Sequence, residues 1–262
     1  MTGDPLGRVM SNKLSVRAVL WTLVLCATLV SGISIAGFNE GVAALDREDF
    51  ASALREFRPL ALKGDADAQN NLGVMYELGQ GVTQDYREAM KWYRLAANQG
   101  YAGAQNNLGV MYDKGRGVAL HYREAVKWYR LAAEQGNASA QHNLGVMYDN
   151  GRGVAQDYRE AAKWYHLAAD QGDPDAQNNL GDMYKDGQGV PPNAIIAYAL
   201  FSLAAAGDPA NGNKATESRT KLAASMSVRE IKAAQDLARE LAKPGNLLQT
   251  LDKFTRKAPS KK

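Results

Sequence analysis

Cysteine and histidine, which enzymes and metal sites use often, are nearly absent from this sequence. Its 262 residues include one cysteine, Cys26, and only three histidines. Cys26 lies in an apolar N-terminal segment that we expect to be removed, so the mature chain would have no thiol. Disulfide bonds, thiolate catalysis and cysteine-ligated zinc are then excluded. Prolines are few, at eight, and most aromatic residues are tyrosine or tryptophan, which favours packed helices.

The sequence also lacks a large excess of either charge. Its formal net charge is +3, but residues 37–242 carry 22 basic and 26 acidic side chains, whereas residues 243–262 carry six basic side chains and one acid, Asp252. The body of the chain is therefore mildly acidic, and we expect no nucleic-acid partner. The basic composition of residues 243–262 predicts a disordered tail.

The longest hydrophobic run is no longer than the core of an export signal. Residues 1–36 contain three basic residues, an apolar run from Ala18 to Val30, and small residues ending at Ala36. A bilayer span needs roughly 20 apolar residues, so a signal peptide cleaved near Ala36 is favoured. The body would then be periplasmic or secreted. The alternative is an uncleaved anchor in the inner membrane, lengthened by the isoleucines beyond Val30, and this segment is the only membrane contact we expect.

A 36-residue period dominates the sequence from residue 65 onward. A leucine-glycine pair, a tyrosine and a Gly-x-Gly turn recur in four consecutive units. Matches at this many positions identify internal repeats, which are the strongest sign of architecture. The recurring residues are Leu72, Leu108, Leu144 and Leu180; Gly73, Gly109, Gly145 and Gly181; Tyr76, Tyr112, Tyr148 and Tyr184; Gly79, Gly115, Gly151 and Gly187; and Gly81, Gly117, Gly153 and Gly189.

Each unit is predicted to be a helical hairpin. In the first unit, apolar residues recur at helical spacing over residues 66–77 and again over residues 86–98. Asp173 followed by Pro174 is typical of a helix start, and Gly136 and Gly172 are typical of helix ends. The Gly-x-Gly loop between the helices lacks the strand and third glycine of a dinucleotide site, so it is interpreted as a structural turn.

The glycine inside each first helix requires an explanation. A glycine in a helix interior costs about 1 kcal/mol relative to alanine. Its repetition at Gly73 and the equivalent positions therefore predicts a close contact between two helices. We expect the contact to involve the small residues Ala96 and Ala97.

One ordered set of residues characterises the unit: Ala68, Leu72, Gly73, Tyr76, Gly79, Gly81, Val82, Asp85, Ala89, Trp92, Tyr93, Ala96, Ala97 and Gly100. This pattern resembles the Sel1-like repeat, a relative of the tetratricopeptide repeat with a longer loop between its helices. The resemblance covers residues 38–242. It implies an all-α fold, a right-handed α/α solenoid of about six helical hairpins.

The segments that flank the repeats differ from them. Residues 37–64 lack the glycine loop and are predicted to form an N-terminal tetratricopeptide-like hairpin before four Sel1-like repeats at residues 65–207. Residues 208–242 are predicted to form capping helices, with Ser227 and Glu230 at the spacing of a capping box. The signal segment at residues 1–36 and the basic tail at residues 243–262 complete this organisation.

Few residues are candidates for catalysis, and they do not form a group. His121 takes the place of a helix-capping aspartate, and His142 and His166 are predicted on adjacent helices without an evident third metal ligand. Ser218 and Lys221 have the spacing of a β-lactamase-type nucleophile, but the other elements of such a site are missing. We therefore expect no catalytic residue, no metal and no cofactor.

Asparagines form the strongest candidate binding site. One lies directly before the periodic leucine of each unit, and another polar residue precedes it. In tetratricopeptide-like relatives the matching asparagine lies on the concave face and hydrogen-bonds the backbone of a bound peptide, so the resemblance implies this role here. The alternative is that each amide satisfies the backbone of a neighbouring repeat. The candidate protein-binding residues are Asn71, Asn107, Asn143 and Asn179, with Asn70, Asn106, His142 and Asn178.

The resemblance implies a non-enzymatic, extracytoplasmic scaffold or regulator that holds a protein segment in its concave groove. Exported relatives act as envelope scaffolds in polysaccharide secretion or restrain sensor kinases, so an envelope sensor or secretion component is the expected kind of partner. The alternative function is an envelope hydrolase or a protein that binds peptidoglycan or β-lactams. Turnover of a β-lactam or of peptidoglycan by the purified protein would favour that alternative.

Overall fold

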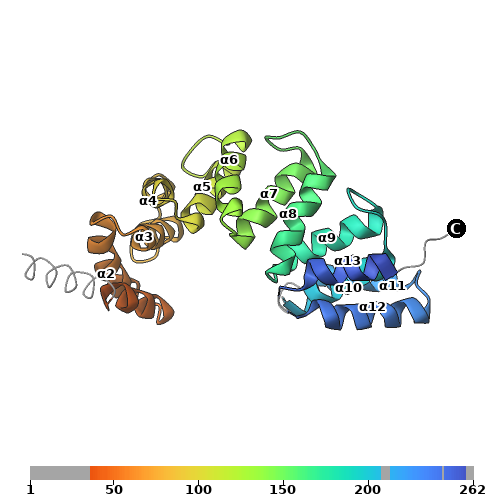
Figure 1. The fold of residues 1–262 in the computed structure, drawn as a ribbon. Helices are drawn as coiled ribbons and strands as arrows, with labels where there is room; N and C mark the ends of the chain where they lie inside the picture. Colours follow the sequence, from red (N-terminus) through yellow and green to blue (C-terminus); the bar gives the residue numbers. More distant parts are fainter. Residues whose placement is uncertain (1–35, 208–212, 244, 258–262) are drawn as a thin grey trace, which may run out of the picture. The chain divides into compact units, whose positions relative to one another are not determined.

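The computed structural model describes residues 36–207, 213–243 and 245–257 (Figure 1). Every regular element in these ranges is a helix, and no strand occurs in them, which confirms the predicted all-α class. None of the described helices is long and apolar enough to cross a membrane. The predicted signal segment, except residue 36, lies outside the described residues. The chain divides into two compact units, residues 1–95 and 96–262, which we describe separately.

The first unit begins with a hairpin that aromatic packing stabilises. A helix over residues 36–46 is followed by α2 (Phe50–Leu62), and α3 (Ala66–Leu78) and the start of α4 (Tyr86–Asn98) come next. The ring of Phe57 is fully buried, with its centroid 5.5 Å from that of Phe38. The two helices of the hairpin predicted within residues 37–64 are therefore present.

The second unit continues the helical hairpins, and each helix packs against the next. Glycines in the left-handed conformation follow both the first and the second helices, and the sequence predicted those after the second helices. The side chain of Asp173 accepts a hydrogen bond from the Ala176 amide at 2.8 Å, with Pro174 in the first turn. The helices of these hairpins are α5 (Ala102–Lys114), α6 (Tyr122–Glu134), α7 (Ala138–Asn150), α8 (Tyr158–Asp170), α9 (Pro174–Asp186) and α10 (Ala194–Gly207).

The helix-interior glycines contact aromatic rings rather than alanines. A Cβ atom at Gly145 would lie 2.7 Å from the ring of Tyr165, and one at Gly181 would lie 2.7 Å from the ring of Phe201. The predicted contact with Ala96 and Ala97 is wrong because the large buried ring, not the small residues, occupies the space in front of the glycine. Within each of these hairpins, an aromatic side chain of one helix thus packs directly against the glycine of the other.

The Gly-x-Gly loop is a structural turn, as predicted, and its two glycines have different tasks. The first, such as Gly151 with φ of 64°, ends the first helix in the left-handed conformation. The second allows the loop to approach the preceding hairpin. A Cβ atom at Gly153 would lie 2.5 Å from the carbonyl carbon of Tyr122. Only glycine permits this approach. The contact between the loop and the preceding hairpin therefore helps to set how consecutive hairpins pack.

The C-terminal region contains one helix more than the sequence predicts. The expected cap is present as α11 (Asn213–Ala223) and α12 (Val228–Leu241), with a complete capping box between Ser227 and Glu230. The prediction of disorder from residue 243 is wrong, because α13 (Leu247–Lys257) follows (Figure 1). Leu247 and Leu251 are 2% and 3% exposed. Together with Phe254 they form an apolar stripe that the basic composition concealed. Residues 258–262 lie outside the described residues.

Candidate functional site

The candidate asparagines join consecutive repeats through their side chains. The Asn143 Nδ2 atom on α7 donates to the Asn106 Oδ1 atom on α5 at 3.1 Å. The Asn179 Nδ2 atom on α9 lies 3.1 Å from the His142 Nε2 atom on α7. All four of these residues are half-buried, as are Asn70, Asn71 and Asn107, while Asn178 is buried. We call the series of contacts from Asn106 to Asn179 the amide ladder.

The contacts of the amide ladder differ from the backbone bonds of the second predicted alternative. Its observed partners are side chains of the adjacent repeat, not backbone groups. A side-chain amide has two donor hydrogens and an oxygen that accepts two bonds. The bond between Asn143 and Asn106 uses one hydrogen of the first amide and one acceptor position of the second. The pair is therefore held in a fixed orientation while keeping hydrogen-bonding capacity at the surface.

Glutamines, rather than asparagines, form hydrogen bonds to the backbone of a neighbouring repeat. Gln141 is 4% exposed, and its Nε2 atom donates to the carbonyl oxygen of Ala133, in the preceding hairpin, at 3.1 Å. The Gln171 Nε2 atom donates to the Gln141 Oε1 atom at 2.8 Å. Sequence reasoning missed this set, although its 36-residue period is as regular as that of the asparagines. The equivalent buried residues are Gln69, Gln105 and Gln177.

Acidic and aromatic groups lie beside the amide ladder. The Tyr165 hydroxyl donates to the Asp149 Oδ2 atom at 3.3 Å, and the ring centroids of Tyr165 and His142 are 5.9 Å apart. Burial raises the pKa of Tyr165, so the hydroxyl stays protonated and acts as a donor. Burial also raises the pKa of Asp149. On α9, the Lys185 Nζ atom donates to the Asp182 Oδ1 atom at 2.6 Å.

The residues considered for catalysis or metal binding have other roles. His121 caps α6, because its Nδ1 atom accepts a hydrogen bond from the Glu124 amide at 3.3 Å. No group of three or more potential metal ligands occurs in the described part of the chain. Lys221 is paired with Glu217 at 2.6 Å on the exposed surface of α11.

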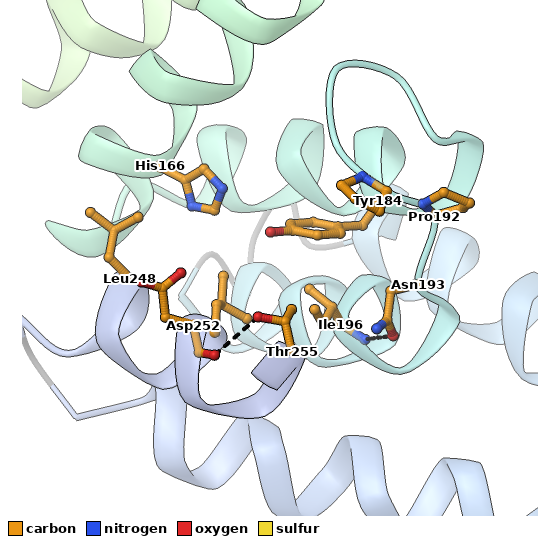
Figure 2. A pocket seen from close by; sticks show the side chains of 10 residues that line it. His166, Tyr184, Pro192, Asn193, Ile196, Leu248, Asp252 and Thr255 are labelled. Atoms are coloured by element: carbon orange, nitrogen blue, oxygen red, sulfur yellow. Dashed lines mark hydrogen bonds between the residues drawn. The ribbon is translucent and has the colours of Figure 1, made fainter. Parts of the chain in front are cut away.

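A separate cavity lies where α13 covers the end of the repeat array (Figure 2). Its volume is about 460 Å³, and His166 and Tyr184 line it opposite Leu248 and Asp252 of α13. The rings of His166 and Tyr184 meet edge to face, with centroids 6.0 Å apart. The backbone amide of Leu247 donates to the Asp170 Oδ1 atom at 2.7 Å and fixes the start of α13 on α8.

His166 is the most perturbed group in this cavity. Its Nδ1 atom is shut off from solvent without a hydrogen-bond partner among the described residues. Burial lowers the pKa of His166 to about 4, although Asp252 and Asp170 favour the protonated ring. The sequence placed His166 on a helix adjacent to that of His142 and did not predict its burial. This burial was missed because α13, the helix that covers His166, was not predicted from the sequence.

Comparisons with known proteins agree with the hairpin fold. The Sel1 repeat family matches residues 66–101, 102–137, 138–173 and 174–209, so the chain belongs to this family. Sel1 repeats commonly mediate protein–protein interactions, and their fold is generally a non-enzymatic scaffold. Among curated proteins, no match was found.

Solved structures show the same architecture. A protective antigen present in uropathogenic Escherichia coli strains, displaying an SLR fold, is 32% identical over 88% of this chain, with a TM-score of 0.63. This chain spans 55% of the length of that antigen. A Sel1 repeat protein from Oxalobacter formigenes is 27% identical over 84% of this chain and 95% of its own, with a TM-score of 0.63. A Pseudomonas aeruginosa structure at 19% identity, covering 82% of this chain and 86% of its own with a TM-score of 0.51, supports the fold alone.

Proposed function

We propose that this protein is a non-enzymatic, extracytoplasmic scaffold that binds a segment of a partner protein along the face carrying the amide ladder. The single observation that supports this function is the orientation of amides across consecutive repeats by the contacts of Asn143 and Asn179. An extended peptide needs alternating donors and acceptors along its length, and a row of fixed amides offers both. The expected partner is an envelope sensor or a secretion component.

Replacing Asn143 and Asn179 together with alanine should weaken partner capture without unfolding the protein. Each lost neutral hydrogen bond is worth about 0.5 to 1.5 kcal/mol, so affinity should fall by about five- to a hundredfold. The melting temperature should change little, because the groups left behind are half-buried and water can reach them. Capture from envelope extract, quantified by mass spectrometry beside a circular dichroism melt, measures both effects.

The matched control for this double variant is Gln141→Ala, on the same helix. It removes two hydrogen bonds, one to the carbonyl of Ala133 and one from the side-chain amide of Gln171, and at about 0.5 to 1.5 kcal/mol each it should cost about 1 to 3 kcal/mol of folding free energy. Its effect on capture should appear only where the protein has begun to unfold. A lowered melting temperature with unchanged capture in the double variant would contradict the binding role and leave the amide ladder purely structural.

The signal-like pattern of residues 1–36 supports the extracytoplasmic part of the proposal. The similar Escherichia coli protein is a protective antigen. Alkaline phosphatase fused after Gly64 should be active, because the enzyme needs the disulfides that form outside the cytoplasm. The N-terminus of the processed protein should lie near Gly37. An inactive fusion would contradict export, whereas an active fusion with an intact N-terminus would indicate the anchored form.

A further inference from the structure

The surface that α13 covers on α8 has a counterpart on α6, one repeat earlier. Residues 36 positions apart are equivalent, so Val126, Arg130 and Glu134 of α6 correspond to Ala162, His166 and Asp170 of α8. On α8 this face is occupied. The backbone amide of Leu247 in α13 donates a hydrogen bond to Asp170, and Leu251 belongs to the same buried cluster as Ala162. Asp252 lies across the cavity from His166 (Figure 2).

On α6 the equivalent face lines a surface groove of about 530 Å³. Leu131 in this groove is 46% exposed, and the side chain of Arg130 is exposed. The floor is apolar, because Val126 and the aliphatic stems of the basic residues form it. We call this the α6 groove, and its lining residues are Arg123, Val126, Lys127, Arg130, Leu131, Glu134 and Gly153.

The two faces differ most in charge. Where α8 has the uncharged His166, α6 has the guanidinium of Arg130, which is held in place by Tyr148. The Arg130 Nη2 atom donates to the Tyr148 hydroxyl at 2.6 Å, and the Arg130 Cζ atom lies 6.0 Å from the centre of the Tyr148 ring. A guanidinium has five N–H donors, so this bond leaves most of them for an incoming carboxylate.

The charge of the α6 groove favours an acidic helix over a basic helix as its ligand. Its lining has three cationic side chains and one carboxylate. The outer face of α13 is basic, with Lys253 and Arg256 exposed, so a second copy of α13 would add positive charge to a basic groove. A helix with the same inward leucines and carboxylate but acidic flanks would meet opposite charges.

We infer that the α6 groove binds an acidic amphipathic helix of a partner protein, in the manner in which α13 occupies the equivalent face of α8. The helix presents leucines to Val126 and Leu131 and a carboxylate to Arg130. Helix-in-groove binding of this kind uses apolar anchors on one face for affinity and charge for selection. This site is distinct from the amide ladder, so its failure and that of the proposed function are distinguishable.

The test uses the full chain, with α13 intact, and a fluorescent peptide based on residues 246–257. A staple joining positions 249 and 253 on the outer face keeps the short peptide helical. In the acidic peptide, Arg256→Glu and Lys257→Glu replace the basic flank. Fluorescence anisotropy should show saturable binding that is at least about tenfold tighter for the acidic peptide than for the unchanged sequence.

Exchange of charges between the groove and the peptide locates the site. Arg130→Glu should weaken binding of the acidic peptide by at least about tenfold, and Asp252→Lys within the peptide should restore binding to that variant. The control Arg239→Glu, an equal charge change on α12, should alter binding by less than about twofold.

Three outcomes would overturn the inference. The first is the absence of saturable binding up to about 1 mM peptide, a concentration that already corresponds to very weak affinity. The second is an equal effect of Arg130→Glu and Arg239→Glu, which would indicate unspecific attraction. The third is self-association of the full chain that Arg130→Glu abolishes, because it would assign the α6 groove to a second copy.

Discussion

Replacing Leu251 with alanine should release α13 from α8 and α12. Leu251 is 3% exposed and belongs to the core cluster that includes Leu247 and Ala162. Truncation of a buried leucine costs about 2 to 5 kcal/mol, and a terminal helix of 11 residues has few other buried side chains to hold it. Hydrogen exchange should show loss of protection across residues 247–257, while amides of α5 and α7 keep theirs.

Leu248→Ala provides the matched control for this change. Leu248 is the adjacent leucine of the same helix, but it is 40% exposed, so its truncation should leave protection of α13 nearly unchanged. Equal protection in the two variants would contradict the assignment of Leu251 as the anchor of α13.

Acidification should loosen α13 through His166. Burial depresses the pKa of this histidine to about 4 in the folded protein, against a usual value near 6.5. The folded state therefore binds fewer protons than the undocked state, and the stabilisation that is complete above about pH 6.5 is lost as the pH falls toward 4. Between pH 7 and pH 5 the loss should be at most about 2 kcal/mol, because one pKa unit corresponds to about 1.4 kcal/mol. Hydrogen exchange of α13 at the two pH values measures it.

The variant His166→Asn separates this effect from general acid sensitivity. Asparagine has no charge to gain, so the difference in α13 protection between pH 7 and pH 5 should largely disappear. Asp252 and Asp170 face the histidine and favour its protonated form, and the pKa of about 4 already includes their effect. Wild-type protein with equal protection at both pH values would contradict the buried, uncharged state of His166.

Periodicity made the helical hairpins readily predictable. The four recurring Gly-x-Gly turns and the Asp173-Pro174 start mark helix ends through local backbone preferences, and the structure places them where the sequence predicts. The partner of Gly145 was predicted wrongly. A glycine inside a helix indicates that another group packs closely against it but does not identify that group. In the fold, the close group is the Tyr165 ring on the next helix.

The candidate site was only partly predictable. The asparagines were found because they recur beside the periodic leucine, but their partners come from the adjacent repeat, 37 residues away in the sequence. The glutamine at the position of Gln141 recurs just as regularly. Nothing in the sequence distinguishes it from a surface glutamine, although its side chain forms a buried hydrogen bond to Ala133. Period alone does not tell a buried amide from an exposed one.

By itself, the sequence of this protein determined the repeat length, the order of helices and turns, and the membership of the Sel1 repeat family, because these depend on local conformation and on identities at a fixed spacing. Only the tertiary structure decided that α13 folds back on α8, which buries His166 beside a cavity and leaves the equivalent face of α6 exposed. The physical reason is that such contacts depend on the positions of atoms from segments far apart in the chain. Leu247 and Asp170, which are 77 residues apart, meet only after the intervening helices have packed.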